Sequence, residues 1–259
     1  MSSEGVRVEI ENYVAVITID RPSKLNALNR QMVVDLAEAC REVEHSKARA
    51  AIITGAGDRS FSAGWDIADW SSDSPEAFGR FWIREGHAAF DALARLRQPL
   101  VAVLNGDCLG GGLELAACAD YRIAESHARI GLPEAGLGVI PGWSGTQRAV
   151  RRFGSQSVRR MALFGDVFGA EQALAVGLVD QICDKGGGMA AARATLGRLL
   201  DRSPQASETV KMLINAAEGE ERERVLESLA GRLAAGSSDL AKGLDAFRQK
   251  RKPDFSQDD

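Results

Sequence analysis

A glycine-rich turn followed by an acid is the stretch of this chain whose residues are best suited to chemistry. Residues 105–114 read N-G-D-C-L-G-G-G-L-E, between an apolar run at 100–104 that predicts a buried strand and one at 113–119 that predicts a helix start. Glycines let the backbone approach a ligand closely, and the free N–H groups of a helix start can receive a negative oxygen. The turn could therefore hold an oxyanion beside Glu114, or it could only pack a helix closely on a strand. These residues alone leave both interpretations open.

The elements that must position this turn alternate between strand and helix. Apolar periodicity and turn residues predict a hairpin of strands at 6–11 and 14–19, a helix after Asn29, a strand at 50–54, a helix at about 74–97 and the strand at 100–104. This order is typical of parallel strands joined by right-handed crossovers. The loops at 61–67 and 105–112 should then leave the same edge of the sheet, where α/β proteins bind ligands.

The second half of the chain becomes increasingly helical. A loop at 132–142, rich in Pro and Gly, precedes a predicted basic helix at 143–153, and from about 189 to 250 nearly every segment has a helical pattern. We therefore expect an α/β part at 1–184 that carries the chemistry. We expect a helical part at 185–259 that covers the core or a neighbouring subunit.

Composition excludes several classes of protein. The 259 residues are 45% apolar and 26% charged, which is ordinary for a globular protein, and the net charge of −4 argues against nucleic-acid binding. Four cysteines, at 40, 108, 118 and 183, lack zinc-site spacing and indicate a reducing compartment. No apolar run is long enough to cross a membrane, and the first five residues are too polar and acidic for a signal peptide. We expect a cytoplasmic protein without a membrane or nucleic-acid partner.

Six motifs along the chain resemble those of the crotonase superfamily, most closely those of the enoyl-CoA hydratases. They are R-P-x-x-x-N-A-L at 21–28, F-S-A-G-W-D-I at 61–67, N-G-x-x-x-G-G-G-x-E at 105–114, P-E-x-x-L-G-x-I-P-G-x-x-G-T-Q-R at 133–148, A-x-x-x-G-L-V at 173–179 and A-F-x-x-K-R-K-P at 246–253. The resemblance implies a crotonase-like spiral of ββα units with a helical C-terminal trimerisation region. It also implies a homotrimer or a homohexamer built as a dimer of trimers.

The same resemblance implies a reaction and a set of site residues. Water would add across the double bond of a 2-enoyl-CoA to give a 3-hydroxyacyl-CoA, with acyl-CoA as substrate and neither a further cofactor nor a metal. Glu114 would orient and deprotonate the water, Glu134 would protonate the α-carbon, and the backbone N–H groups of Ala63 and Gly111 would form the oxyanion hole. The residues expected to bind substrate and CoA are Lys24, Leu25, Ala27, Ala63, Gly64, Trp65, Asp66, Ile67, Gly110 and Trp143.

Two alternatives and two departures accompany this interpretation. The alternatives are another crotonase-type enzyme, such as an enoyl-CoA isomerase, and a non-catalytic acyl-CoA-binding or RNA-binding relative. In the isomerases the position of Glu114 is often not acidic, so its presence favours water addition. Trp65 and Trp143 stand where smaller residues are frequent in the family, and they could narrow the acyl site. Ser144 is a poor nucleophile candidate because Thr146 interrupts the G-x-S-x-G pattern.

Overall fold

The computed structural model describes residues 4–256 and divides into two compact units, Met1–Glu208 and Thr209–Asp259. The boundary falls inside helix α10 (Pro204–Ala217). The change of composition at residue 184 precedes this boundary, because helix α9 (Gly188–Leu200) still packs on the sheet of the first unit through Ala192 and Leu196.

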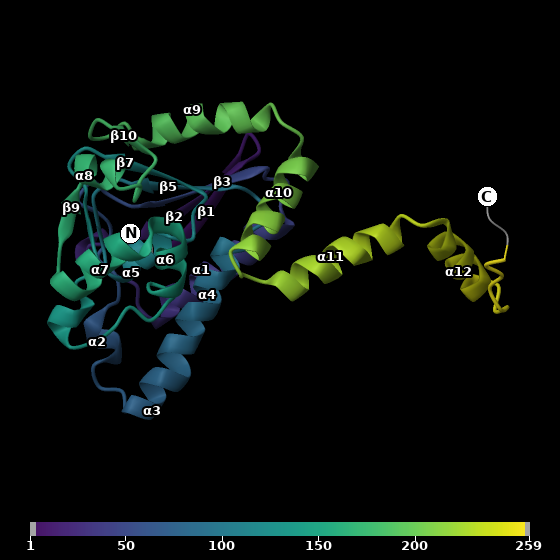
Figure 1. The fold of residues 1–259 in the computed structure, drawn as a ribbon, viewed down its shortest axis with the longest axis horizontal. Coiled ribbons are helices and arrows are strands. Elements are labelled where there is room, and N and C mark those ends of the chain that lie inside the picture. Colours follow the sequence, from purple (N-terminus) through teal and green to yellow (C-terminus); the bar gives the residue numbers. More distant parts are fainter. Residues whose placement is uncertain (1–3, 257–259) are drawn as a thin grey trace. The chain divides into compact units, whose positions relative to one another are not determined.

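The first unit contains a six-stranded sheet (Figure 1). Its strands lie in the order β1 (Gly5–Glu11), β2 (Val14–Asp20), β3 (Ala50–Gly55), β5 (Leu100–Leu104), β7 (Tyr121–Glu125) and β10 (Gln181–Cys183). Strands β1 and β2 are antiparallel, and every later pairing in this sheet is parallel, as predicted. The two hairpin residues, Asn12 and Tyr13, have φ of 50° and 65°, as a tight two-residue hairpin turn requires.

A second sheet of four short strands has the order β4 (Ser60–Ser62), β6 (Asp107–Leu109), β8 (Arg129–Gly131) and β9 (Val167–Gly169). The chain places β3 in the large sheet and then β4 in the small one, and it repeats this step with β5 and β6 and with β7 and β8. The predicted spiral of ββα units is therefore confirmed. The sequence predicted loops at 61–67 and 105–112, and the structure instead includes part of each in a three-residue strand.

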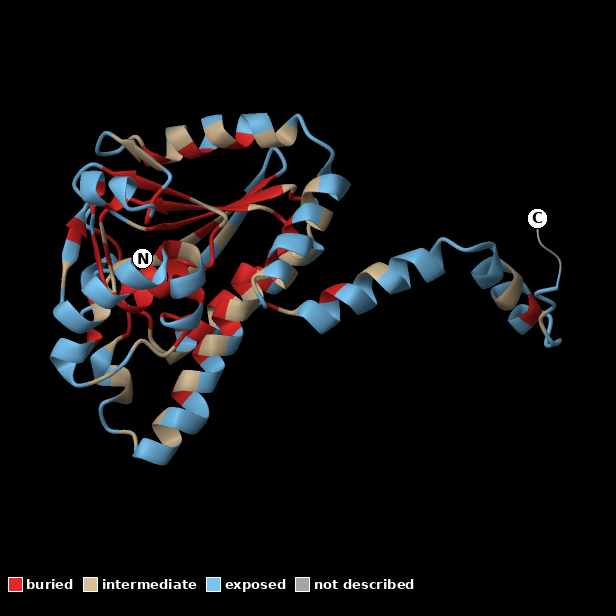
Figure 2. Ribbon diagram, viewed as in Figure 1, coloured by how far each residue is buried: buried red, intermediate tan, exposed pale blue. Residues whose placement is uncertain are grey.

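Helices cover both faces of the large sheet, and Figure 2 shows that its central strands β3, β5 and β7 are mostly buried, whereas the edge strand β1 is largely exposed. Helices α1 (Arg30–His45) and α4 (Arg84–Ala94) contribute to the core on one face, where Ala51 and Ile53 of β3 point. The alternate residues Ala50 and Ile52 face α9 on the other side. The Asn29 side chain caps α1 by accepting the Met32 N–H, as predicted for this residue.

The remaining helices of the first unit are short. They are α2 (Ile67–Trp70), α3 (Pro75–Ala77), a π-helical stretch at Phe78–Ile83, α5 (Gly111–Ala116), α6 (Gln147–Phe153), α7 (Ser155–Phe164) and α8 (Ala170–Ala175). The helix predicted at 143–153 thus begins later, at Gln147, because Ser144 has a φ of 81° that no helix accepts. Residues 143–146 form a turn instead.

The second unit contains the end of α10 together with α11 (Arg222–Ala235) and α12 (Ser238–Arg248). Both later helices carry large apolar side chains in solvent, and Leu233 and Phe247 are 79% and 82% exposed. Among residues 4–256 no helix is long and apolar enough to span a membrane.

Candidate active site

Glu114 is held at the start of α5, immediately after the glycine turn. Its side chain is buried, and its Oε1 accepts hydrogen bonds from the backbone N–H groups of Trp143 and Gly145 at 2.6 and 2.7 Å. A Cβ on Gly145 would lie 2.6 Å from this oxygen, so only glycine lets the loop approach the carboxylate. Among the described residues, the second oxygen, Oε2, has no hydrogen-bond partner. One oxygen of the acid is therefore fixed and the other is available.

Glu134 begins the 3₁₀ turn Glu134–Leu137 and is also buried. Neither of its carboxylate oxygens has a hydrogen-bond partner within residues 4–256. A Cβ on Gly110 would lie 3.1 Å from its Oε1, so this acid faces the glycine turn that precedes Glu114. The structure thus brings the two acids predicted from the sequence to one place.

Burial raises the pKa of both acids. Loss of hydration and the charge of Glu134 raise the pKa of Glu114 to about 8, although the N–H groups of Trp143 and Gly145 and the Trp65 side chain lower it. Loss of hydration raises the pKa of Glu134 to about 7. Two repelling acids with raised pKa values can hold one proton between them near neutral pH, which gives the site one acid and one base.

The glycine turn of α5 faces the turn at residues 63–65. A Cβ on Gly64 would lie 2.8 Å from the Gly111 nitrogen, and a Cβ on Gly111 would lie 3.3 Å from the Gly64 Cα. Gly64 also has a φ of 96°, a conformation that other residues rarely adopt. Backbone therefore meets backbone at this point, between the two loops that the sequence placed at the same edge of the sheet. Gly111 is the first residue of its helix, where an N–H group has no partner within the helix.

The Ala63 N–H differs from the expectation that it helps to form the oxyanion hole. It donates to the Leu25 carbonyl at 2.9 Å, so it is already occupied. Leu28 pairs with Trp65 in a parallel bridge through the Gly64 carbonyl and the Asp66 N–H. Because backbone groups alternate along an extended segment, the Trp65 N–H points away from Leu28, and within the described chain it has no hydrogen-bond acceptor. It is the available donor of this turn.

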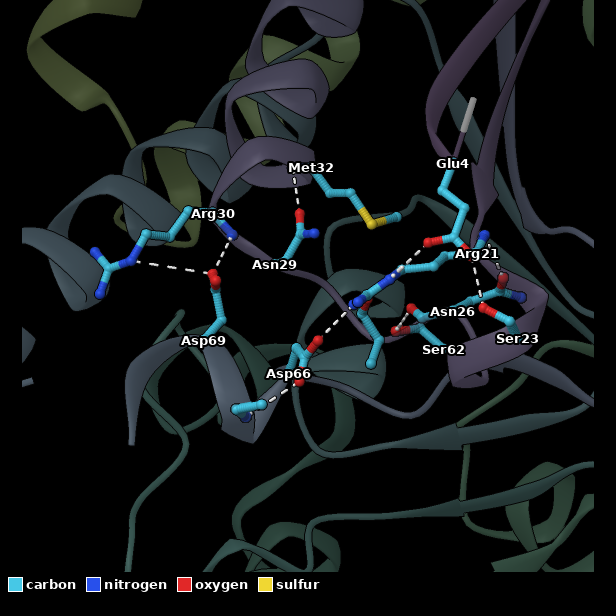
Figure 3. A network of polar contacts seen from close by, with 12 residues as sticks. Glu4, Arg21, Ser23, Asn26, Asn29, Arg30, Met32, Ser62, Asp66 and Asp69 are labelled. Atoms are coloured by element: carbon cyan, nitrogen blue, oxygen red, sulfur yellow. Dashed lines mark hydrogen bonds and ion pairs between the residues drawn. The ribbon is translucent and has the colours of Figure 1, made fainter. Parts of the chain in front are cut away.

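A polar network joins the 21–29 segment to the same turn (Figure 3). Arg21 Nη1 donates to Asp66 at 2.6 Å, and Arg21 Nε donates to Glu4 at 3.1 Å. Burial raises the pKa of Asp66, but hydrogen bonds from Arg21 and the Ala68 N–H outweigh it and lower the pKa overall. Asp66 is thus an ionised anchor that also caps α2 through the Ala68 N–H.

The other residues expected to bind substrate lie at different depths. Lys24, Leu25 and Ile67 are exposed, and Ala27 is half-buried beside them in sequence. Trp65 is 9% exposed, and a Cβ on Gly111 would lie 2.4 Å from its ring, so its indole borders the glycine turn.

Trp143 has no exposed surface, and its indole N–H donates to the Trp82 carbonyl at 3.1 Å. Its backbone N–H, rather than its ring, contacts Glu114.

Two functional contacts escaped sequence reasoning. The N–H donors from Trp143 and Gly145 come from a loop that the sequence predicted in part as helix, and the only available signal was the pair of glycines flanking Trp143 and Ser144.

Within residues 4–256 no group of His, Cys, Asp and Glu side chains is arranged to hold a metal ion. The four cysteines, all within the described residues, are thiols and not disulfides.

Comparisons with known proteins agree with this geometry. The family model described as enoyl-CoA hydratase/isomerase matches residues 9–258. The chain is 35% identical to a crotonyl-CoA hydratase of Syntrophomonas wolfei, with 98% of this chain and 99% of the relative covered. It is 36% identical to a short-chain-enoyl-CoA hydratase of Clostridium acetobutylicum, with 97% of each covered. The crystal structure of an enoyl-CoA hydratase from Thermoplasma volcanium superposes with a TM-score of 0.78 at 32% identity, covering 96% of this chain and 98% of that one.

Proposed function

Because this chain belongs to the enoyl-CoA hydratase/isomerase family, we propose that it is a hydratase that adds water across the double bond of a 2-enoyl-CoA to give a 3-hydroxyacyl-CoA. The observation that carries the proposal is the pair of buried acids, Glu114 and Glu134, with three carboxylate oxygens that lack a partner in the described part of the chain. Water addition needs a base for the water and an acid for the α-carbon, and this pair supplies both without a further cofactor.

The two acids divide the proton transfers. Glu114 Oε2 accepts a proton from the water as the water oxygen bonds to the β-carbon, while Oε1 remains fixed by its two N–H donors. Glu134 delivers its proton to the α-carbon. Burial raises the pKa of both acids, so the pair holds one proton near neutral pH. The N–H donors from Trp143 and Gly145 lower the pKa of Glu114, and they therefore favour the state in which Glu114 is ionised and Glu134 holds the proton.

The thioester oxygen gains negative charge when water attacks, and backbone N–H groups stabilise it. The Gly111 N–H is one donor, as expected from the sequence. The Trp65 N–H takes the place that the sequence assigned to Ala63, because the Ala63 N–H is bonded to the Leu25 carbonyl. Donors of this kind are each worth about 10²–10³ in rate.

The exposed residues near this turn are suited to the CoA part of the substrate. Lys24 carries a positive charge for a phosphate, while Leu25, Ala27 and Ile67 offer apolar surface beside it. Gly64 and Gly110 leave room for the thioester, and Asp66 holds the segment through Arg21.

The protein assembles as a homotrimer, or as a homohexamer made of two trimers. The support is the apolar surface of α11 and α12, where Leu226, Leu233 and Phe247 are more than half exposed. The four cysteines, which are thiols and not disulfides, support a reducing compartment such as the cytoplasm.

The test is a panel of 2-enoyl-CoA thioesters of increasing chain length, followed by the loss of absorbance of the conjugated double bond. A hydratase consumes at least one member and yields the 3-hydroxyacyl-CoA, identified by mass. A 3-enoyl-CoA is included, and its conversion to the 2-enoyl-CoA without hydration would show an isomerase instead. Binding of thioesters without turnover of any would show a non-catalytic relative.

A further inference from the structure

Ser144 lies between the two residues whose N–H groups hold Glu114. It is buried, and its φ is 81°, in the left-handed region that strains a side chain other than glycine. This conformation turns the N–H groups of Trp143 and Gly145 toward the same oxygen, at 2.6 and 2.7 Å. A strained residue persists only where its surroundings impose the conformation, so the contacts of Ser144 matter.

The Ser144 side chain is anchored to α4. Its Oγ lies 3.1 Å from His87 Nε2, at hydrogen-bond distance. The neighbouring Gly86 is in close contact with the Trp143 indole, since a Cβ there would lie 2.0 Å from the ring. Consecutive residues of α4 therefore contact consecutive residues of the loop.

His87 is itself restrained. Its Nε2 lies 3.8 Å from Asp91 Oδ1, one turn further along α4, and Asp91 is paired with Arg95 at 3.0 Å and with Arg148 at 2.7 Å. The Ser144 carbonyl accepts the Arg148 N–H at 2.9 Å at the start of α6. The loop is thus fixed between two helices through one serine.

We propose that Ser144 and His87 are a positioning pair, which holds the 143–145 turn so that its two N–H groups bind Glu114 Oε1 and leave Oε2 directed at the reacting water. This inference rests on the proposed function. Neither residue touches the substrate in this arrangement; both act through Glu114. Ser144 is no nucleophile, because its hydroxyl faces α4.

Three variants test the pair: Ser144→Ala, which removes the hydroxyl; Ser144→Gly, which also relieves the strain at φ 81°; and His87→Ala. Each should lower kcat by about 10-fold to 100-fold with KM changed less than about twofold, because small displacements of a catalytic group are costly. His87→Gln, which keeps a donor and an acceptor on the side chain, should recover part of the lost kcat. Asn12→Gly is the matched control, since it relieves a positive φ in the hairpin, remote in sequence from the acids.

Ser144→Gly separates positioning from stability. It should unfold no more easily than the wild type and yet be slower, whereas a merely structural serine predicts a variant that is as fast as the wild type. Equal kcat in Ser144→Ala, Ser144→Gly and the wild type would overturn the inference.

A second readout needs no turnover. The carboxyl carbon of Glu114, followed by ¹³C NMR in labelled protein, should titrate at higher pH in Ser144→Ala, because misdirected N–H donors no longer lower its pKa. An unchanged titration refutes the positioning pair even if the wild type hydrates nothing on the thioester panel. Failure of the panel alone refutes the proposed function and not this contact.

Discussion

Replacing Glu134 with Gln should change how the stability of the protein depends on pH. In the folded state burial raises the pKa of Glu134 from 4.5 to about 7, so the folded protein holds this proton over a pH range in which the unfolded chain has lost it. The stabilisation from that proton is fully present below pH 4.5 and is lost as the pH rises through 7. Gln does not titrate, so the free energy of unfolding of the variant does not fall for this reason as the pH rises.

The size of the effect follows from the shift. A difference of 7 − 4.5 = 2.5 pKa units at about 1.4 kcal/mol per unit corresponds to roughly 3 kcal/mol in the free energy of unfolding. Relative to the wild type, Glu134→Gln should therefore gain roughly 3 kcal/mol between pH 4.5 and pH 8. Glu114 adds to this gain, because the charge of Glu134 contributes to the raised pKa of Glu114 and the variant lacks that charge.

The assay is urea unfolding of both proteins at several pH values between 4.5 and 8.5, at one protein concentration because an oligomer's stability depends on it. Glu11→Gln, at the exposed end of β1, is the control for removing a carboxylate outside the site. A difference between Glu134→Gln and wild type that stays constant within about 0.5 kcal/mol across this range would refute the buried, unpartnered state of Glu134.

Three further predictions concern catalysis, assembly and specificity. Glu114→Gln and Glu134→Gln should each lower kcat by about 10²–10⁴-fold while the fold is retained. The decrease of kcat in the double variant should be smaller than the product of the two single decreases, because both acids act on one water. A near-normal kcat in either single variant would contradict the division of proton transfers. Light scattering at micromolar concentration should give the mass of a trimer or hexamer, and a monomeric mass would exclude the assembly through the helices after residue 184. Trp65→Ala should improve kcat/KM for longer enoyl-CoAs relative to crotonyl-CoA by about one or two decades, because the Trp65 ring borders the glycine turn. Trp143→Ala should lower stability and leave the dependence of kcat/KM on chain length unchanged, because the Trp143 ring is fully buried. A change in this dependence in Trp143→Ala alone would reverse these assignments.

The sequence was most informative where periodicity extends over many residues. The hairpin of β1 and β2 and helix α1 follow from runs of six or more residues with alternation or helical spacing, and the buried strands β3 and β5 follow from continuous apolar runs. The small sheet was missed because strands of three residues, such as β4 and β6, are too short to show a period and are specified by their neighbours.

At the site, residue types were easier to predict than backbone contacts. Glu114 and Glu134 lie near each other as expected, because the motifs at 105–114 and 133–148 that carry the family resemblance each contain one of these acids. The Ala63 N–H differs, since its partner, the Leu25 carbonyl, comes from a segment 38 positions earlier, and no local pattern reports which N–H group of the 63–65 turn is already bonded. The contact between His87 and Ser144 is equally non-local.

The small sheet has a consequence for how this site can diversify. Strands β4 and β6 are parallel neighbours in which Ser60 pairs with Asp107 and, after an irregularity in the register, Ser62 pairs with Cys108, so the turns that follow them start from adjacent strands. The distance between the two backbone donors, the N–H groups of Trp65 and Gly111, therefore depends mainly on the spacing of hydrogen-bonded strands, about 4.8 Å, and little on side chains. The side chain at position 65 can then be exchanged, for an indole or for a methyl group, without dismantling the backbone that polarises the thioester. In such a molecule, mutations can change the substrate range without changing the backbone groups that stabilise the thioester oxygen.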